Sequence, residues 1–255
     1  MLLLTGLLVG AGILRLPMEA AFQDHLKDAG LKEEALDLSM REEIGQASFV
    51  AILGGFRSLV ASILSLEAHS EWEKREWGKV DSLYEIITQL QPGIGAYWDS
   101  AAWHMAYNAA SDSANSPVLP ESSRRQLYKS YVDKGIAYLE GGIRNSPDDY
   151  RLPAMLAMIY KDRVDPPDYE QASRWFGRAA ELPGPLKIYE RFQYMELAKV
   201  PGREREAYEN LRRLYLEHER HHTKSLITAL GRLEDKLVVP EDERLIEDFD
   251  EAADP

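Results

Sequence analysis

The chain has 255 residues, 45% of them hydrophobic, which is enough to bury a sizeable core in one elongated repeat domain or in two small domains. Its 43 acidic residues outnumber its 30 basic residues, and the formal net charge of -13 argues against a nucleic-acid-binding protein, which needs a basic face to neutralise phosphates. Because the chain has no cysteine, disulfides, thiolate zinc sites, iron–sulfur clusters and cysteine nucleophiles are excluded.

The chain begins with an uncharged, leucine-rich run at residues 2–14. A helix of this length reaches only about 20 Å, so a membrane span also needs the residues that follow Arg15. We expect residues 1–22 to be a retained membrane anchor; the alternatives are a cleaved signal segment, a helix of the soluble domain and a start codon assigned too early. Arg15 and Lys27 determine the orientation only weakly, and we expect an anchor in a bacterial inner membrane with the body outside the cytoplasm.

Polar residues 23–38 predict a linker between this segment and the folded domain. The capping box Ser39-x-x-Glu42 predicts that a helix begins there, because both side chains can satisfy free N–H groups of the first turn. We expect a helical-repeat domain over residues 39–237, followed by an acidic cap or tail at residues 238–255.

The stretch from Phe49 to Leu66 is almost wholly apolar. We reject a second membrane span here because Arg57 is costly in lipid and the pair Gly54-Gly55 is unfavourable inside a helix. We expect two buried helices instead, hinged at the glycine pair, that form the inner floor of the domain.

Apolar residues at helical spacing predict further helices, and no strand signal has comparable length. The chain is therefore expected to be all-α. The helices are expected at about residues 79–90, 97–110, 121–144, 151–161, 185–199, 204–219 and 223–237, with one more before Pro183 and a short acidic cap at 241–249.

Small and large apolar residues recur at a fixed spacing in the second half of the chain. The motif Ala172-x-x-x-Phe176-x-x-Ala179 is followed by a similar one that begins at Ala207, and the two alanines lie 207 − 172 = 35 residues apart. A period near 34 residues is typical of helix–turn–helix solenoids, in which each hairpin buries its apolar face on a neighbour. Such stacks provide binding surfaces rather than reaction centres.

These motifs resemble the tetratricopeptide repeat (TPR) family, whose units place small and aromatic residues at fixed positions and end in proline. The best match is Asp168-Tyr169-x-x-Ala172-x-x-x-Phe176-x-x-Ala179-x-x-x-Pro183, and a degenerate one is Trp77-x-x-Val80-x-x-x-Tyr84-x-x-Ile87-x-x-x-x-Pro92. The resemblance covers about residues 57–216 and implies a helical-hairpin solenoid with a concave groove. The chain is also similar to uncharacterised membrane-anchored bacterial proteins of this kind, which implies no known reaction.

The chain departs from the family pattern in three places. The interval from Pro92 to Pro147 is longer than one repeat, the sequence Asp165-Pro166-Pro167 lengthens a turn that should be tight, and Gly135 replaces the usual alanine. We therefore expect the repeat to be irregular.

One predicted helix, at about residues 97–110, has the most unusual composition. We expect Trp98, Ala102, Met105 and Ala109 to pack in the core. The candidate partner contacts on this helix are His104, Tyr107 and Asn108, which we expect to face a groove.

Three arginines are candidate anchors for an acidic group of a partner: Arg57, Arg151 and Arg191. For Arg57 the alternative is a buried side chain paired with a helix-end carbonyl or a carboxylate.

The sequence from His218 to His222 reads H-E-x-x-H, a zincin signature in which two histidines one helical turn apart bind zinc. Glu241, Asp242 or Glu243 is a candidate third ligand. The alternative is a charged helix end at which the histidines interact favourably with the dipole. The charged flanks favour this alternative, since a catalytic zinc helix lies in a dry cleft.

We therefore expect a membrane-tethered helical-repeat scaffold or adaptor that binds a protein or peptide partner in a concave groove. We expect no cofactor, metal, small-molecule substrate or enzymatic activity. Two alternatives stay open: a zinc-dependent hydrolase that uses His218 and His222, and a structural accessory subunit of an envelope complex, docked on an integral membrane partner through residues 49–66.

Overall fold

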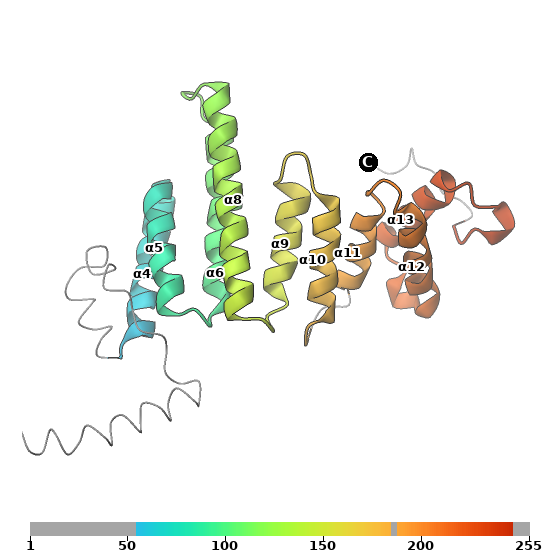
Figure 1. Ribbon diagram of the computed structural model, residues 1–255, viewed down its shortest axis with the longest axis horizontal. Helices are drawn as coiled ribbons and strands as arrows, with labels where there is room; N and C mark the ends of the chain where they lie inside the picture. Colours follow the sequence, from blue (N-terminus) through green and yellow to red (C-terminus); the bar gives the residue numbers. More distant parts are fainter. Residues whose placement is uncertain (1–54, 185–187, 247–255) are drawn as a thin grey trace, which may run out of the picture. The chain divides into compact units, whose positions relative to one another are not determined.

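The computed structural model describes residues 55–184 and 188–246, which fold as helices without a strand among them (Figure 1). All of them belong to one compact unit, residues 50–255. The all-α prediction is confirmed for this part of the chain. The expected anchor, the linker and the capping box lie outside the described residues, as does the glycine hinge up to Gly54.

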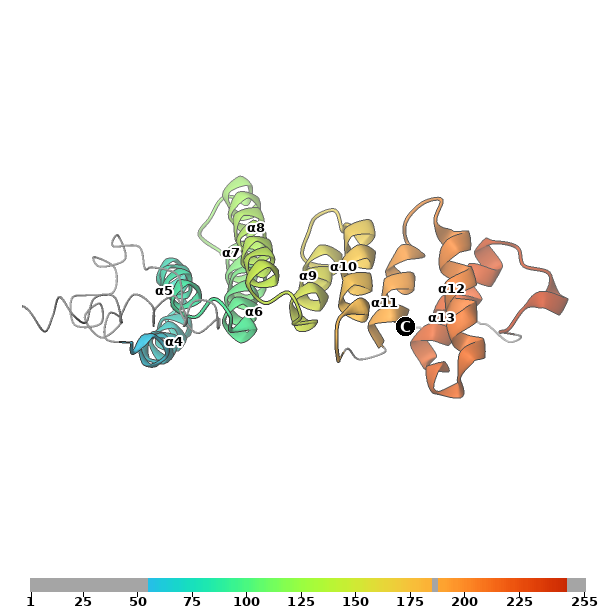
Figure 2. The same cartoon turned by 60° about the horizontal axis from the view of Figure 1, so that its bottom comes forward.

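Consecutive helices pack against one another in chain order (Figures 1 and 2). The main contacts join α4 to α5, α6, η1 and α7 to α8, α8 to α9, α9 to α10, α10 to α11, α11 to α12, and α12 to α13. The elements are α4 (Arg57–Glu73), α5 (Trp77–Leu90), α6 (Gly95–Trp103), the π-helix η1 (His104–Ala109), α7 (Ala110–Ala114), α8 (Glu121–Asn145), α9 (Arg151–Asp162), α10 (Tyr169–Glu181), α11 (Ile188–Leu197), α12 (Glu204–Glu217), the 3-10 helix η2 (Glu219–His221), α13 (Lys224–Lys236) and the 3-10 helix η3 (Glu241–Glu243).

Most of the predicted helix ends lie within a few residues of the observed ones. Two helices begin at side-chain caps: Asp168 accepts a hydrogen bond from the amide of Gln171 (2.9 Å), and Thr223 accepts one from the amide of Leu226 (3.4 Å). The expected helix at 97–110 is instead a longer rod, residues 95–114, interrupted by η1.

The recurring residues of the sequence motifs lie in the core. Ala172, Phe176 and Ala179 of α10 are at most 1% exposed, and so are the corresponding residues of α12, Ala207, Leu211 and Leu214. The small residues let neighbouring helices approach closely, while the larger ones fill the space between them. The predicted apolar periodicity therefore identifies the buried faces of these two helices.

Gly135 of α8 lies where this helix packs very closely on the segment of α6 and η1. A Cβ atom on Gly135 would lie 2.6 Å from the Cβ of Ala106 and 3.0 Å from the carbonyl oxygen of Ala102. Even an alanine would collide here, which explains why this position departs from the repeat pattern.

The first described helix corrects the expectation of a fully buried apolar segment. One face of α4 is buried through Val60, Ala61, Leu64 and Ala68. On the other face, four large apolar side chains are each more than half exposed: Phe56, Leu59, Ile63 and Leu66. A helix that is apolar on two faces was expected to pack on both of them, whereas within the described chain α4 packs mainly on α5.

None of the helices within 55–184 and 188–246 combines the length and the apolar character that a bilayer span requires.

Gly135→Ala should destabilise the protein by about 1–3 kcal/mol, because the added methyl group meets backbone and side-chain atoms that cannot both move away. The matched control is Gly78→Ala in α5, where a Cβ meets nothing within 4 Å. That change should be neutral or stabilising by at most about 1 kcal/mol. Urea unfolding of both variants measures the difference, and equal free energies of unfolding would contradict this close packing.

Candidate partner-binding site

The three expected contact residues of the 97–110 segment lie on the π-helix η1, between α6 and α7. The amide of Ala110 donates to the carbonyl of Met105, five residues earlier, so the carbonyl of Ala106 is released from the usual helical ladder. Arg163, in the turn after α9, donates from Nε to this freed carbonyl at 2.9 Å. A side chain from a distant part of the sequence therefore takes the place of a helical hydrogen bond.

Tyr107 and Asn108 line a cavity of about 780 Å³ between the α4–α5 turn and the η1–α7 rod. We call it the Tyr107 pocket. Its lining residues are Trp72, Glu73, Arg75, Trp77, Tyr107, Asn108, Ser111, Asp112 and Asn115. The pocket combines aromatic surface with hydrogen-bonding groups from two parts of the chain, as binding sites for protein side chains commonly do.

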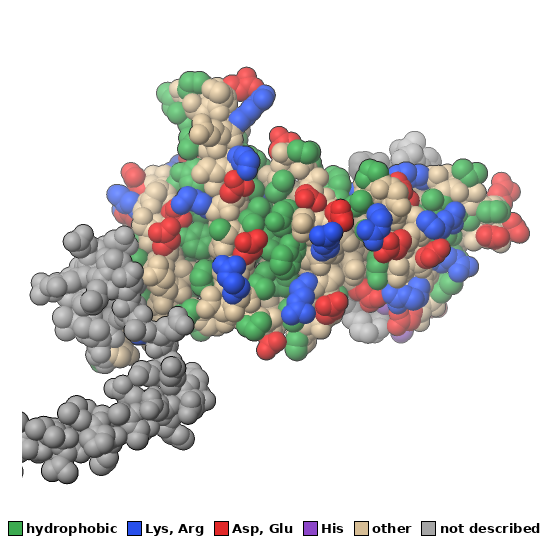
Figure 3. Space-filling model, in the orientation of Figure 1, with side chains coloured by type: hydrophobic (Ala, Val, Ile, Leu, Met, Phe, Trp, Pro, Cys, Tyr) green, Lys and Arg blue, Asp and Glu red, His purple; other side chains and the backbone are tan. Residues whose placement is uncertain are grey.

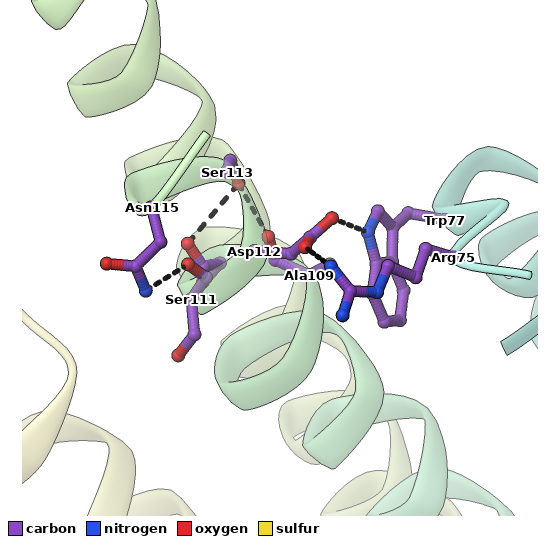
Figure 4. Close-up of polar contacts among 8 residues, drawn as sticks. Arg75, Trp77, Ala109, Ser111, Asp112, Ser113 and Asn115 are labelled. Carbon is purple, nitrogen blue, oxygen red and sulfur yellow. Dashed lines mark hydrogen bonds and ion pairs between the residues drawn. The ribbon is translucent and has the colours of Figure 1, made fainter. Parts of the chain in front are cut away.

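A carboxylate fixes the two walls of the Tyr107 pocket to each other (Figure 4). Asp112 of α7 accepts hydrogen bonds from Nη1 of Arg75 at 2.9 Å and from Nε1 of Trp77 at 2.8 Å. Arg75 lies in the turn between α4 and α5 with a φ of 60°, a conformation that is strained for a residue with a Cβ. The contacts with Asp112 hold this turn in place against α7.

His104 lies behind the pocket rather than on its surface. Its ring centroid is 5.8 Å from that of Trp72 and 5.5 Å from that of Tyr84, and its Nδ1 is 3.1 Å from Nδ2 of Asn108. Burial, followed by repulsion from His69, lowers the pKa of His104 below its ordinary value of 6.5. The ring is therefore neutral at pH 7, and its Nδ1 can accept the hydrogen bond from the Asn108 amide.

Tyr107 is held by contacts on its ring. It stacks on the exposed Trp103 with 4.5 Å between ring centroids, and the guanidinium carbon of Arg163 lies 5.1 Å from its centroid. Burial is the main cause that raises the pKa of Tyr107 to about 12. The phenol therefore stays protonated at neutral pH and can donate a hydrogen bond.

Two positioning residues were missed by the sequence interpretation, Arg163 and Asp112. Besides its bond to Ala106, Arg163 donates from Nη2 to Oγ of Ser111 at 2.7 Å. Each contact joins residues more than 30 positions apart in the chain, and neither residue belongs to a local motif that would have identified it. Of the four residues predicted to lie in the core, Ala102, Met105 and Ala109 are fully buried. Trp98 is only half-buried, and its Nε1 donates to the carbonyl of Pro92 at 2.8 Å.

The three candidate arginines are not among the residues that line the Tyr107 pocket. Arg57 is the half-buried first residue of α4. Arg151 donates from Nε and Nη2 to the two carboxylate oxygens of Asp149, at 2.8 and 2.7 Å, at the start of α9. Arg191 is only 8% exposed, its Nε has no hydrogen-bond partner, and burial lowers the pKa of its guanidinium.

The H-E-x-x-H sequence does not lie on a continuous α-helix, as its zinc-binding interpretation requires; Glu219–His221 form the 3-10 helix η2. α12 ends at Glu217, and His218 is extended, with φ and ψ of −165° and 136°. The ring of His222 stacks on Tyr215, and its Nε2 lies 2.8 Å from the carbonyl oxygen of Tyr215, an acceptor left free at the end of α12. Within the part of the chain that the structure describes, no three His, Asp or Glu side chains form a cluster suited to a metal ion.

The lowered pKa of His104 predicts a pH-dependent stability. The unfolded chain binds the proton more readily than the folded chain, so stability is complete above the ordinary pKa of 6.5 and decreases as pH falls below it. His104→Gln should flatten the decrease measured by urea unfolding between about pH 8 and about pH 5. NMR titration of the His104 ring should show the lowered pKa directly, and a pKa at or above its ordinary value would contradict this prediction.

Comparison with known proteins identifies no family for this chain. No protein-family model matches it, and no curated protein shows significant similarity to it. The all-helical fold and the Tyr107 pocket are therefore the observations from which a function can be proposed.

Proposed function

We propose that this protein is a helical-repeat scaffold that binds a protein or peptide partner in the Tyr107 pocket. The observation that carries the proposal is the pocket itself: a cavity of about 780 Å³ with two tryptophans, a tyrosine, amides and carboxylates in its lining. Partly exposed aromatic residues within a rim of hydrogen-bonding groups are typical of interface hot spots. The contacts of Asp112 and Arg163 organise the pocket in advance, which reduces the entropy lost on binding.

As part of this proposal, the helices form a stack of TPR-like hairpins. The equivalent buried residues of α10 and α12 and the sequential contacts from α9 to α13 support this interpretation. Attachment to a bacterial inner membrane through residues 1–22, with the body outside the cytoplasm, is part of the same proposal. The end of α12 before His218 favours a binding role over zinc hydrolysis.

A photo-crosslinking amino acid at Asn115, an exposed residue of the pocket lining, should capture the partner in extracts of the source cells. Tyr107→Ala should reduce the captured amount at least about tenfold, because a hot-spot tyrosine contributes roughly 2 kcal/mol. Since Tyr107→Ala also removes the stack on Trp103, a second variant, Glu73→Trp, fills the pocket from its exposed rim.

The matched control places the same crosslinker at Glu209, an exposed residue of α12 outside the pocket lining. The product captured from Asn115 should not form at Glu209. If both pocket variants, folded by circular dichroism, capture the same product as the wild type, the Tyr107 pocket is not the binding site.

A second candidate function, an accessory subunit docked on a membrane assembly, is favoured by the exposed face of α4. Phe56, Leu59, Ile63 and Leu66 follow a spacing of three, four and three residues, which is the pattern of a seam between paired helices. Such a stripe can pack on a helix of another subunit without any other change in the fold.

Ile63→Glu should release the full-length protein from such an assembly, because it places a charge in the seam. Ser58→Glu is the matched control and should have no effect, because Ser58 is exposed but is not three or four positions from any residue of the stripe. Native electrophoresis of detergent-solubilised membranes measures the size of the complex. If the two variants migrate alike, α4 does not dock in this way.

A further inference from the structure

The guanidinium of Arg191, in the first turn of α11, is a buried positive charge without a carboxylate partner among the described residues. The residue is only 8% exposed, and its Nε is the one buried side-chain nitrogen or oxygen without a hydrogen-bond partner in residues 55–184 and 188–246. A guanidinium stays protonated in proteins, and a buried charge without a partner is costly. The group therefore requires an anion that these residues do not supply.

Two arginines of the neighbouring helices, by contrast, pair with carboxylates. On the face shown in Figure 3, acidic and basic side chains are interspersed over the C-terminal helices. Arg178 pairs with Glu181 at 3.6 Å, and Arg213 pairs with Glu190 at 2.6 Å. Glu190 precedes Arg191 directly, so the carboxylate nearest to Arg191 in the sequence is already engaged.

The surroundings of Arg191 do not compensate its charge. Burial alone lowers the pKa of its guanidinium, so no carboxylate of the described residues raises this pKa. The ring of Phe192, whose centroid is 5.9 Å from the guanidinium carbon, offers only a weak attraction. An anion that reaches this position consequently meets one uncompensated positive charge.

The start of α11 adds backbone donors to the same place. The first N–H groups of an α-helix have no acceptor within the helix, and they favour an anion. Side chains of helical residues leave the backbone toward the helix N-terminus, so the side chain of Arg191 starts in the direction of these groups. The six residues before α11, Leu-Pro-Gly-Pro-Leu-Lys at 182–187, contain no side-chain oxygen that could cap them.

We propose that the start of α11 is a binding site for a carboxylate group, with the guanidinium of Arg191 as its main ligand. A carboxylate matches the two-pronged donor geometry of a guanidinium. Arg151 shows this geometry, since its Nε and Nη2 donate to the two carboxylate oxygens of Asp149 at 2.8 and 2.7 Å. The same arrangement would give the Nε of Arg191 an acceptor.

The charge of the site favours a carboxylate over a phosphate. A carboxylate carries one negative charge, which matches the single guanidinium, whereas a phosphate dianion would leave excess negative charge beside the half-buried rings of Tyr189 and Phe192. This site goes beyond the proposed function, because α11 contributes no residue to the lining of the Tyr107 pocket.

Two sources can supply the carboxylate, a separate molecule or the chain itself. Ile246 is buried in the same core cluster as Leu197 of α11, and Arg191 lies six residues before Leu197, or about 9 Å along the helix axis. The residues that follow Ile246 lie outside the described residues, and their acidic members are Glu247, Asp248, Asp250, Glu251 and Asp254. The chemistry recognised by the site is the same for both sources, and the test below distinguishes them.

The test titrates the isotope-labelled full-length protein with sodium acetate at neutral pH, with the ionic strength held constant by sodium chloride. The Nε–H signal of Arg191 in the NMR spectrum, assigned by its loss in Arg191→Met, should shift along a saturable curve. The signal of Arg178, which is exposed, should change little and without saturation.

A second readout is the midpoint of urea unfolding. Acetate should raise the midpoint of the wild type relative to chloride, because a ligand that binds only the folded chain stabilises it. Arg191→Met should fold, since it replaces an uncompensated charge by an apolar side chain, and should lose this rise. Arg178→Met is the matched control and should keep it. An equal rise in both variants would overturn the role of Arg191.

Inorganic phosphate, titrated in the same way, should bind more weakly than acetate. Tighter binding of phosphate would overturn the assignment of a carboxylate ligand. Tyr107→Ala should leave the acetate titration unchanged, so a failure of this proposal and a failure of the Tyr107 pocket are distinguishable.

The source is determined with a full-length variant in which the five acidic residues after Ile246 are changed to amides. If these residues supply the carboxylate, the Arg191 signal of the variant differs from that of the wild type before acetate is added, and the variant binds acetate more tightly. If a separate molecule supplies it, both proteins give the same signal and the same affinity. Either result supports the site, whereas the absence of a saturable shift in both proteins would overturn it.

Discussion

The contact between Gly135 of α8 and Ala106 of η1 sets the position of the candidate site. A hydrogen atom in place of a side chain lets α8 approach η1 so closely that an added Cβ would lie 2.6 Å from the Cβ of Ala106. Tyr107, the next residue, is thereby placed on one wall of the pocket. Core packing of this kind transmits strain because interiors are dense and have few voids. The geometry of the pocket therefore depends on a contact that makes no polar interaction of its own.

Hydrogen bonds between distant segments then hold the walls of the pocket in place. Arg163 donates to the carbonyl that the π-helix releases, and Tyr128 of α8 donates to the carbonyl of Arg163 at 2.8 Å. Asp112 joins the α4–α5 turn to α7 through Arg75 and Trp77. The bonds to the carbonyls of Ala106 and Arg163, and the bond from Trp77 to Asp112, are partly buried, where an unpaired polar group would be costly. Together they connect segments far apart in the sequence around one aromatic cavity.

The Tyr107 pocket presents tryptophan and tyrosine rings beside a carboxylate that is already paired. Within the described residues each helix contacts mainly its neighbours in the chain. The pocket is accordingly built from elements that follow one another closely in the sequence, α4, α5, η1 and α7.

The apolar periodicity and its proline boundaries determined the all-α class, most helix ends and the buried faces of α10 and α12. These features are local, because a helix is read from residues three and four positions apart. The unusual composition of residues 97–110 also predicted that Tyr107 and Asn108 face a groove, and both line the Tyr107 pocket. Only the tertiary structure decided that His104 lies behind them and that α12 stops before His218. It also decided that Arg163 and Asp112 complete the pocket, because contacts between distant segments leave no periodic trace in the sequence.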